Sequence, residues 1–190
     1  MKSSPRMPVL FLALLASVSL RAEEAPKPMP PPEGTALLAD LRGEQAGIFA
    51  YGTWKEHTAA TPSGYAVLGS KGAQGNGGFG RDLPAAVDLN NVRYLEVALG
   101  TTPVNQVPQV TIALNDADGT QFAARVLVEQ LVPGSPVWLR ARREDFKLNG
   151  VERGADGEMD WSKVTRWHLQ GDWTTHLPMQ VIFVALRSRR

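Results

Sequence analysis

Hydrophobic and polar residues alternate with a period of two along much of this chain, and this alternation predicts β-strands. Between Asn91 and Leu127 three such segments follow one another, with apolar residues at every second position: Leu95, Val97 and Leu99, then Val110, Ile112 and Leu114, then Phe122, Ala124 and Val126. Successive side chains of a strand point to opposite faces, so each segment predicts a strand with one apolar face. The segment Asn115–Gly119 predicts a tight hairpin turn whose glycine takes the left-handed backbone conformation.

Further strands are predicted on both sides of this region, at Ala36–Leu41, Gly64–Gly69, Pro136–Arg140, Val164–Gln170 and Met179–Leu186. The last of these is apolar on both faces, which is typical of a strand at the centre of a sheet. Residues 47–54 read either as a strand or as an irregular loop, and residues 141–160 as a long connection. No run of ten residues has a helical period outside the N-terminal segment. The pattern predicts an all-β domain of eight or nine strands, folded as a two-sheet antiparallel β-sandwich.

A glycine-rich segment, residues 70–80, follows one of the predicted strands and has five glycines in eleven residues. Such loops can bind phosphate, but this one lacks the Gly-Lys-Ser/Thr ending of a P-loop and does not open a helix, as a dinucleotide-binding loop would. Asp82-Leu83-Pro84 interrupts the chain directly afterwards. The segment is therefore predicted to be a flexible or tightly turned β-loop.

The N-terminal 22 residues have the three parts of a secretory signal peptide: Lys2 and Arg6, the apolar run Met7–Leu20, and the small residue Ala22. Residues 23–34 contain five prolines and predict an extended linker. A single domain is expected over residues 35–190. The protein is thus expected to be exported, to a periplasm or out of the cell, with no membrane span after cleavage. The chain has no cysteine, so the exported domain must depend on its hydrophobic core rather than on disulfides.

Charge and reactive side chains narrow the function classes. The whole chain has a net charge of +1, and removing the signal peptide leaves the acidic residues in slight excess. Neither this balance nor the short basic runs indicate a nucleic acid as partner. The sequence has no cysteine nucleophile and no Gly-x-Ser-x-Gly motif, and His57, His168 and His176 show no metal-ligand spacing. No cofactor is predicted.

Three segments together resemble the galactose-binding-like jelly roll. They are Val87-Asp88-Leu89 followed by Tyr94-Leu95-Glu96-Val97, the stretch Ile112–Thr120, and the late stretch Val164–Trp173. The resemblance extends over about residues 35–186. This architecture includes many carbohydrate-binding modules, among them family 11, and domains of the complex I intermediate-associated protein type. It implies a jelly-roll sandwich that binds a carbohydrate.

One feature departs from that superfamily, whose members often hold a structural calcium ion by acids near the first and last strands. Asp40 can serve as the first-strand acid, but the last strand, Val181–Ala185, has none. Calcium needs six to eight oxygen ligands, so no metal site is predicted.

The residues predicted to bind a ligand lie on the mixed faces of the strands, opposite the apolar faces, and are expected on one sheet: Tyr94, Glu96, Gln109, Arg125, Trp138, Arg140, Arg166, His168 and Gln170. Aromatic rings bind the C–H faces of sugars, and amide, carboxylate and guanidinium groups bind their hydroxyls. Trp138 is the best candidate for an exposed platform, because it is out of phase with Val137 and Leu139, whereas Trp167 is in phase with Leu169 and is expected in the core.

We therefore predict an exported, non-catalytic domain whose partner is a polysaccharide or other glycan. Two alternatives remain at this stage. One is a structural or protein-interaction domain of the cell envelope, whose mixed sheet face docks an envelope protein and binds no small ligand. The other is a small hydrolase with a pair of acids that the sequence does not single out.

Overall fold

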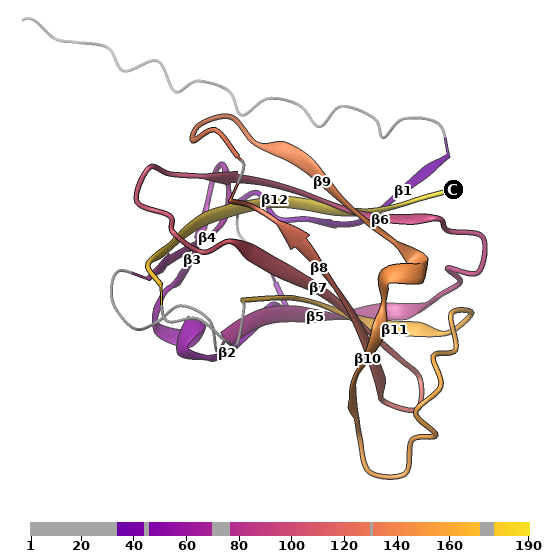
Figure 1. The fold of residues 1–190 in the computed structure, drawn as a ribbon. Coiled ribbons are helices and arrows are strands. Elements are labelled where there is room, and N and C mark those ends of the chain that lie inside the picture. The colour runs from indigo at the N-terminus through magenta and orange to yellow at the C-terminus, as the bar shows by residue number, and fades with distance from the viewer. Residues whose placement is uncertain (1–33, 44–45, 70–76, 130, 172–176) are drawn as a thin grey trace, which may run out of the picture.

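The protein folds as two antiparallel β-sheets that face each other, as Figure 1 shows for the computed structural model. The structure describes residues 34–43, 46–69, 77–129, 131–171 and 177–190. The predicted signal peptide, residues 23–33 of the linker, residues 70–76 of the glycine-rich segment, Trp173 and His176 lie outside the described residues. The predicted two-sheet β-sandwich is confirmed.

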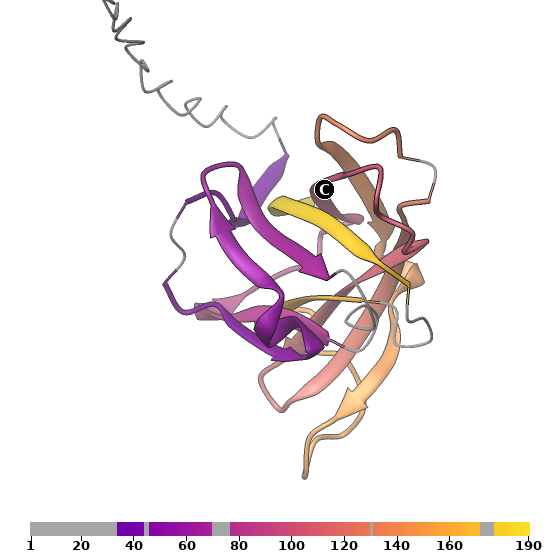
Figure 2. The same cartoon turned by 90° about the vertical axis from the view of Figure 1, so that its left-hand side faces the viewer.

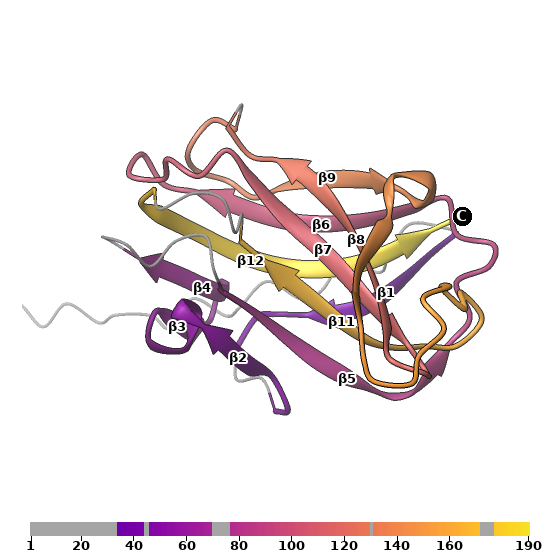
Figure 3. The same ribbon diagram turned by 60° about the horizontal axis from the view of Figure 1, so that its bottom comes forward.

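Sheet A has the strand order β3-β4-β12-β6-β9, with β1 also paired to β12. Its strands are β1 (Thr35–Asp40), β3 (Thr58–Thr61), β4 (Gly64–Gly69), β6 (Tyr94–Thr101), β9 (Val137–Arg142) and β12 (Met179–Arg189). One edge of β12 pairs with β4 and then with β1, and the other edge pairs with β6 (Figure 3). The prediction that the last strand is central to its sheet is therefore confirmed. The β3–β4 hairpin closes one side of this sheet, beside the C-terminal strand (Figure 2).

Sheet B has the order β10-β8-β7-β11-β5-β2. Its strands are β2 (Phe49–Gly52), β5 (Gly77–Val87), β7 (Gln109–Asp116), β8 (Thr120–Leu127), β10 (Lys147–Val151) and β11 (Val164–Gln170). Two short 3-10 helices are described, η1 (Thr53–Glu56) and η2 (Arg143–Asp145). The β7–β8 hairpin turns at Gly119, whose φ of +95° is the left-handed conformation expected there.

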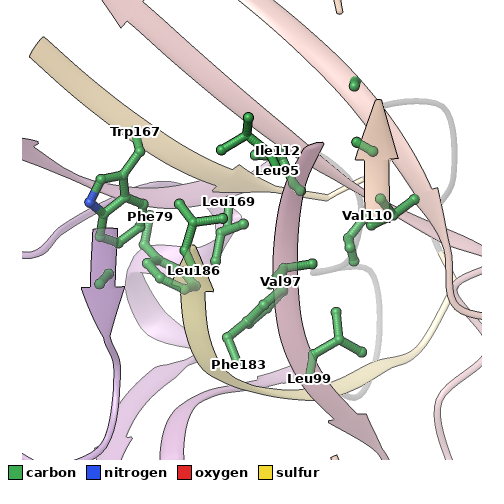
Figure 4. Close-up of a cluster of buried hydrophobic side chains, with 14 of the residues drawn as sticks. Phe79, Leu95, Val97, Leu99, Val110, Ile112, Trp167, Leu169, Phe183 and Leu186 are labelled. Atoms are coloured by element: carbon green, nitrogen blue, oxygen red, sulfur yellow. The ribbon is translucent and has the colours of Figure 1, made fainter. Parts of the chain in front are cut away.

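The apolar faces of the two sheets form one core between them. Figure 4 shows side chains of this buried cluster, among them Val97, Leu99 and Phe183 of sheet A and Ile112 and Leu169 of sheet B. Such aliphatic and aromatic burial is the main favourable contribution to folding in a domain without disulfides. The core also includes two fully buried tryptophans, Trp54 of η1 and, as predicted, Trp167.

The strand count and two loop predictions were wrong. The described residues form twelve strands rather than eight or nine, since β10 lies in the predicted long connection and β2 in the segment read as strand or loop. Strand β5 begins at Gly77, inside the predicted glycine-rich loop, and continues past Pro84. The proline is tolerated because it falls between Asp82 and Val87, where the pairing with β11 shifts register.

Candidate functional site

The nine residues predicted to bind a ligand do not share one sheet. The outer face of sheet A holds Tyr94, Glu96, Trp138 and Arg140, and the outer face of sheet B holds Gln109, Arg125, Arg166, His168 and Gln170. The single-sheet expectation was wrong because the connection at residues 102–108 takes the chain from β6 in one sheet to β7 in the other. Alternation shows which residues share a face of a strand, but not which sheet the strand joins.

On sheet A, the predicted residues form a network whose polar groups satisfy one another. Glu96 is 1% exposed and accepts hydrogen bonds from Arg187 (Nε–Oε2, 2.6 Å) and Arg140 (Nε–Oε1, 3.0 Å). Burial acts to raise the pKa of Glu96, but these two arginines outweigh it and lower the pKa below its ordinary value. The guanidinium of Arg187 also lies 3.7 Å from the centre of the Trp138 ring, and that of Arg140 lies 4.8 Å from the Tyr94 ring. Arg187 and Arg140 thus bind the carboxylate, and each also covers one face of a neighbouring aromatic ring.

On sheet B, the strand register aligns outward-facing residues in rows that cross the sheet. The first row begins with an aromatic residue and ends with a cation: Tyr51 (β2), Gly78 (β5), Gln170 (β11), Thr111 (β7) and Arg125 (β8). The second row has small residues at its centre: Phe49, Gly80, His168, Ala113, Ala123 and Lys147. This face therefore has a low floor with taller side chains at both ends.

The glycines of β5 allow aromatic rings to lie flat on the sheet. A Cβ atom at Gly78 would lie 2.4 Å from the Tyr51 hydroxyl oxygen, and a Cβ atom at Gly80 would lie 2.8 Å from Nδ1 of His168. The rings of Phe49 and Tyr51 each meet the His168 ring edge to face, with centres 5.7 Å apart. Any larger residue at the two glycine positions would displace this aromatic cluster.

A chain of hydrogen bonds between side chains crosses four strands of the same face. Asn115 Oδ1 accepts from Gln121 Nε2 (3.0 Å) and lies 2.9 Å from His168 Nε2, while Gln121 Oε1 accepts from Asn149 Nδ2 (2.6 Å). With these amide orientations Nε2 of His168 is the protonated nitrogen, so Nδ1 is the unprotonated one. Burial, together with the charge of Arg166, lowers the pKa of His168 to about 4. The imidazole is therefore neutral at physiological pH.

Tyr51 is held as a neutral phenol beside Gln170. Burial raises the pKa of Tyr51 to about 12, against a partial opposing effect of the Gln170 side chain. The hydroxyl is buried and makes no regular hydrogen bond with a described residue. Its ring, rather than its hydroxyl, is the part of Tyr51 that can contribute to binding.

A cleft of about 650 Å³ lies over the other half of this face. Its floor is formed by Thr111, Ala123 and Gln170, and its walls include Arg125, Lys147 and Asn149. Arg125 is exposed and forms no ion pair with a described residue. The cleft thus offers amides, a hydroxyl and two cations above a flat floor.

The remaining predicted residues of sheet B lie at the borders of this site. Arg166 is ion-paired with Asp82 and with Glu152 (Nη1–Oε1, 3.6 Å), and Gln109 lies at the first position of β7, opposite Leu127. Both lie on the predicted face, but only Arg125, His168 and Gln170 of the nine belong to the two central rows.

Sequence reasoning missed several residues of the site: Phe49, Tyr51, Gly78, Gly80, Lys147 and Asn149. One signal was present in the sequence. Aromatic residues two positions apart in residues 47–54, and glycines two positions apart in residues 77–80, match two neighbouring strands in which rings lie over glycines. The pairing itself is a long-range property and could not be read from either segment alone.

Two further observations concern metals and membranes. Asp40, the residue considered for a calcium site, forms a two-point ion pair with Arg42 (Nη2–Oδ2, 2.6 Å), whose hydrogen bond lowers the pKa of the carboxyl. The described residues hold no group of three or more acidic or histidine side chains placed to bind a metal ion. Nor do they contain a helix long and apolar enough to cross a membrane.

No known protein family matches the chain, and no curated protein matches it in sequence. The fold, in contrast, matches solved structures. The family 11 carbohydrate-binding module of the cellulosomal cellulase Lic26A-Cel5E of Clostridium thermocellum has a TM-score of 0.54 at 15% identity, covering 82% of this chain and 94% of that one. The family 11 module of Clostridium thermocellum in complex with a β-1,3-1,4-mixed-linked tetrasaccharide has a TM-score of 0.55 at 13% identity, with 82% and 95% covered.

A part of a larger protein matches equally well. The agarase AgWH50C has a TM-score of 0.55 at 11% identity, with 83% of this chain but only 24% of the agarase covered. At these identities the likeness establishes the fold alone. The protein has a jelly-roll β-sandwich fold like that of these carbohydrate-binding modules, as the resemblance in its sequence implied.

Proposed function

We propose that this protein is an exported, non-catalytic domain that binds a glycan chain along the outer face of sheet B. The observation that supports this most directly is the first row of that face, which leads from the Tyr51 ring past Gln170 and Thr111 to Arg125. The row crosses five strands, which lie about 5 Å apart, so its length suits an oligosaccharide rather than a single sugar.

The chemistry of the row matches what a neutral sugar presents. A pyranose has apolar C–H faces, which pack on aromatic rings, and hydroxyls, which accept and donate hydrogen bonds. Tyr51 supplies the ring, Gln170 and Asn149 supply amides, and Arg125 supplies a guanidinium. The small residues Ala113 and Ala123 leave room for the sugar above the sheet.

The non-catalytic part of the proposal is supported by the acids of the cleft. Hydrolysis of a glycosidic bond generally needs two carboxyl groups, about 5 to 10 Å apart, on either side of the bond. Among the described residues that line the cleft, Asp145 is the only carboxylic acid. A single acid at the rim favours binding over hydrolysis.

The decisive experiment is calorimetric titration of the wild-type protein with a panel of neutral oligosaccharides. The panel includes a mixed-linked β-1,3-1,4 tetrasaccharide and an agaro-oligosaccharide, because structures of similar fold belong to a module that binds the first and to an agarase. We expect saturable binding of at least one of them, weakened at least ten-fold in Arg125→Gln and in Tyr51→Ala. The exposed Arg125 makes the first variant safe for folding.

The matched control is Trp138→Ala, which removes the aromatic residue predicted from the sequence but lies on sheet A. Binding should be unchanged in this variant. Loss of binding in Trp138→Ala with retention in Arg125→Gln would move the site to sheet A. No saturable binding across the panel would refute the proposal and would favour the protein-interaction alternative.

Export is tested separately by expressing residues 1–190 and fractionating the cells. A product shortened by about 22 residues, found outside the cytoplasm, is the expected result. A full-length cytoplasmic product would show that the N-terminal segment is not a signal peptide.

A further inference from the structure

A second cleft, of about 610 Å³, lies away from the outer face of sheet B. It is formed where the first residue of β6, the last residue of β9, η2 and the segment before β11 come together. Along residues 144–147, alternate residues line the two clefts. Glu144 and Phe146 line this second cleft, and Asp145 and Lys147 line the cleft on sheet B.

The aromatic residues of this second cleft are held in fixed positions. Phe146, which is 3% exposed, meets Trp161 edge to face, with ring centres 5.6 Å apart at 88°. The guanidinium of Arg143 lies 4.7 Å from the centre of the Trp161 ring. Tyr94 also lines the cleft and is half-buried. Such rings offer apolar contact area at little cost in side-chain entropy.

The same cleft has an excess of positive charge. Its lining includes Arg93, Arg142 and Arg143 but a single acid, Glu144. Arg142 pairs with Glu144 at 3.1 Å, and both side chains are largely exposed, at 65% and 72%, so water competes strongly for this pair. Arg143 uses its Nη1 to donate to the backbone carbonyl of Asn90.

Arg93 is the guanidinium best placed to receive a ligand. It is exposed, and it forms no ion pair with any residue that the structure describes. Its backbone joins the two neighbouring segments, since Arg93 N donates to the carbonyl of Arg189 and Arg93 O accepts from Arg143 N, at 2.9 and 2.8 Å. The backbone position of Arg93 is thus fixed while its side chain remains available.

We propose that this second cleft binds a carboxylate-bearing sugar, a uronic acid residue of an acidic polysaccharide. The C–H face of the sugar would pack against Tyr94 and Trp161, and its carboxylate would meet Arg93 and Arg142. Arginine suits this role because its planar fork binds a carboxylate through two parallel hydrogen bonds. The whole chain has almost equal numbers of acidic and basic residues. Three arginines beside two aromatic residues in one cleft therefore favour an anionic sugar over a neutral one.

The test follows the indole N–H signal of Trp161 by NMR during titration of the full-length protein with trigalacturonate. The signal is assigned by its absence in Trp161→Phe. We expect a saturable shift with trigalacturonate, and at least ten-fold weaker binding of its fully methyl-esterified form, which has the same rings without the charge. Arg93→Gln and Arg142→Gln should each weaken the binding of trigalacturonate at least five-fold. Both residues are exposed, so neither change should impair folding.

Arg125→Gln, on sheet B, is the matched control and should leave this titration unchanged. Equal binding of the methyl ester, or no saturable shift of Trp161, would overturn the inference. A shift of the same size with inorganic sulfate at equal concentration would also overturn the inference, because the cleft would then bind anions without recognising the sugar ring. Loss of binding in Arg125→Gln with retention in Arg93→Gln would place the acidic sugar on sheet B and leave the proposed function intact.

Discussion

At the scale of single residues, the site on sheet B depends on side chains that are buried although they point away from the core. His168 is 6% exposed and Gln170 is 5% exposed. Both lie on the outer face, covered by the aromatic cluster and by their neighbours. A buried polar residue is stable only when its hydrogen bonds are satisfied, and His168 satisfies one ring nitrogen through Asn115. The protonation state of this histidine is therefore tied to folding.

His168 should make the stability of the protein depend on pH. Its pKa in the folded state is about 4, below the ordinary 6.5, so between these values the unfolded chain binds the proton more tightly. The contribution of neutral His168 is complete above pH 6.5 and is lost as the pH falls toward 4. The total effect is at most about 3 kcal/mol.

Urea unfolding at several pH values between 7.5 and 4.5 measures this effect. Below pH 5 carboxylates add their own dependence, so the informative quantity is the difference between the wild type and His168→Gln. That difference should shrink as the pH falls. Parallel curves for the wild type and His168→Gln would contradict the prediction.

Glu96 is the corresponding residue on sheet A. Replacing it by glutamine removes the charge that Arg187, only 11% exposed, needs as its partner. Leaving a largely buried cation unpaired is costly, and we expect Glu96→Gln to lower the free energy of unfolding by about 2 kcal/mol. Glu144→Gln breaks an exposed pair of the same type, for which water competes, and should lower the free energy of unfolding much less. Chemical denaturation of both variants measures these losses. An equal loss of the free energy of unfolding in the two variants would show that burial does not make the Glu96 pairs more stabilising than an exposed pair.

At the scale of elements, β5 shows how one strand shapes the site. Gly80→Ala would place a Cβ atom 2.5 Å from the Trp167 carbonyl oxygen and 2.8 Å from His168 Nδ1. Because a backbone atom is one of the two, the clash cannot be relieved by a side-chain rotation. We expect a loss of about 1 to 3 kcal/mol in the free energy of unfolding, and weaker glycan binding on sheet B.

Gly150→Ala is the matched control for this strand prediction. Gly150 lies in β10 of the same sheet, and the nearest atom to an added Cβ would be Gln121 Cβ at 4.0 Å. Its stability should be within about 0.5 kcal/mol of the wild type. If Gly80→Ala unfolds at the same denaturant concentration as Gly150→Ala, then β5 tolerates a larger residue beneath the rings.

The sequence predicted strands well and their partners poorly. Regular alternation located β6, β7, β8 and β11, because each has an apolar core face, and a continuous apolar run located β12. It did not locate β10, which is exposed at most positions and so lacks a clear alternation. It misread the start of β5, where glycines signal a turn locally but are required by rings from β2 and β11. The site depends on such long-range pairing, and so only three of the nine predicted residues fall in its two central rows.

At the scale of the whole molecule, the sandwich separates two chemically different surfaces. Sheet B presents a row of aromatic, amide and cationic groups that is open to a ligand at its cleft, whereas the polar groups of sheet A are largely occupied by one another. Stacked sheets lie about 10 Å apart, with the core between them. Residues on the two outer faces therefore share no direct contact.

This separation predicts that changes on the two faces act independently on stability. Gly80→Ala disturbs the rings on the outer face of sheet B, and Glu96→Gln disturbs the arginine network on the outer face of sheet A, with the core between them. Mutations that are distant and share no partner usually add within about 0.5 kcal/mol, so the double variant should lose the sum of the two single losses. Denaturation of the wild type, both single variants and the double variant measures the coupling. A coupling above about 1 kcal/mol would mean that the core transmits strain between the sheets, and that the two faces cannot be treated as separate sites.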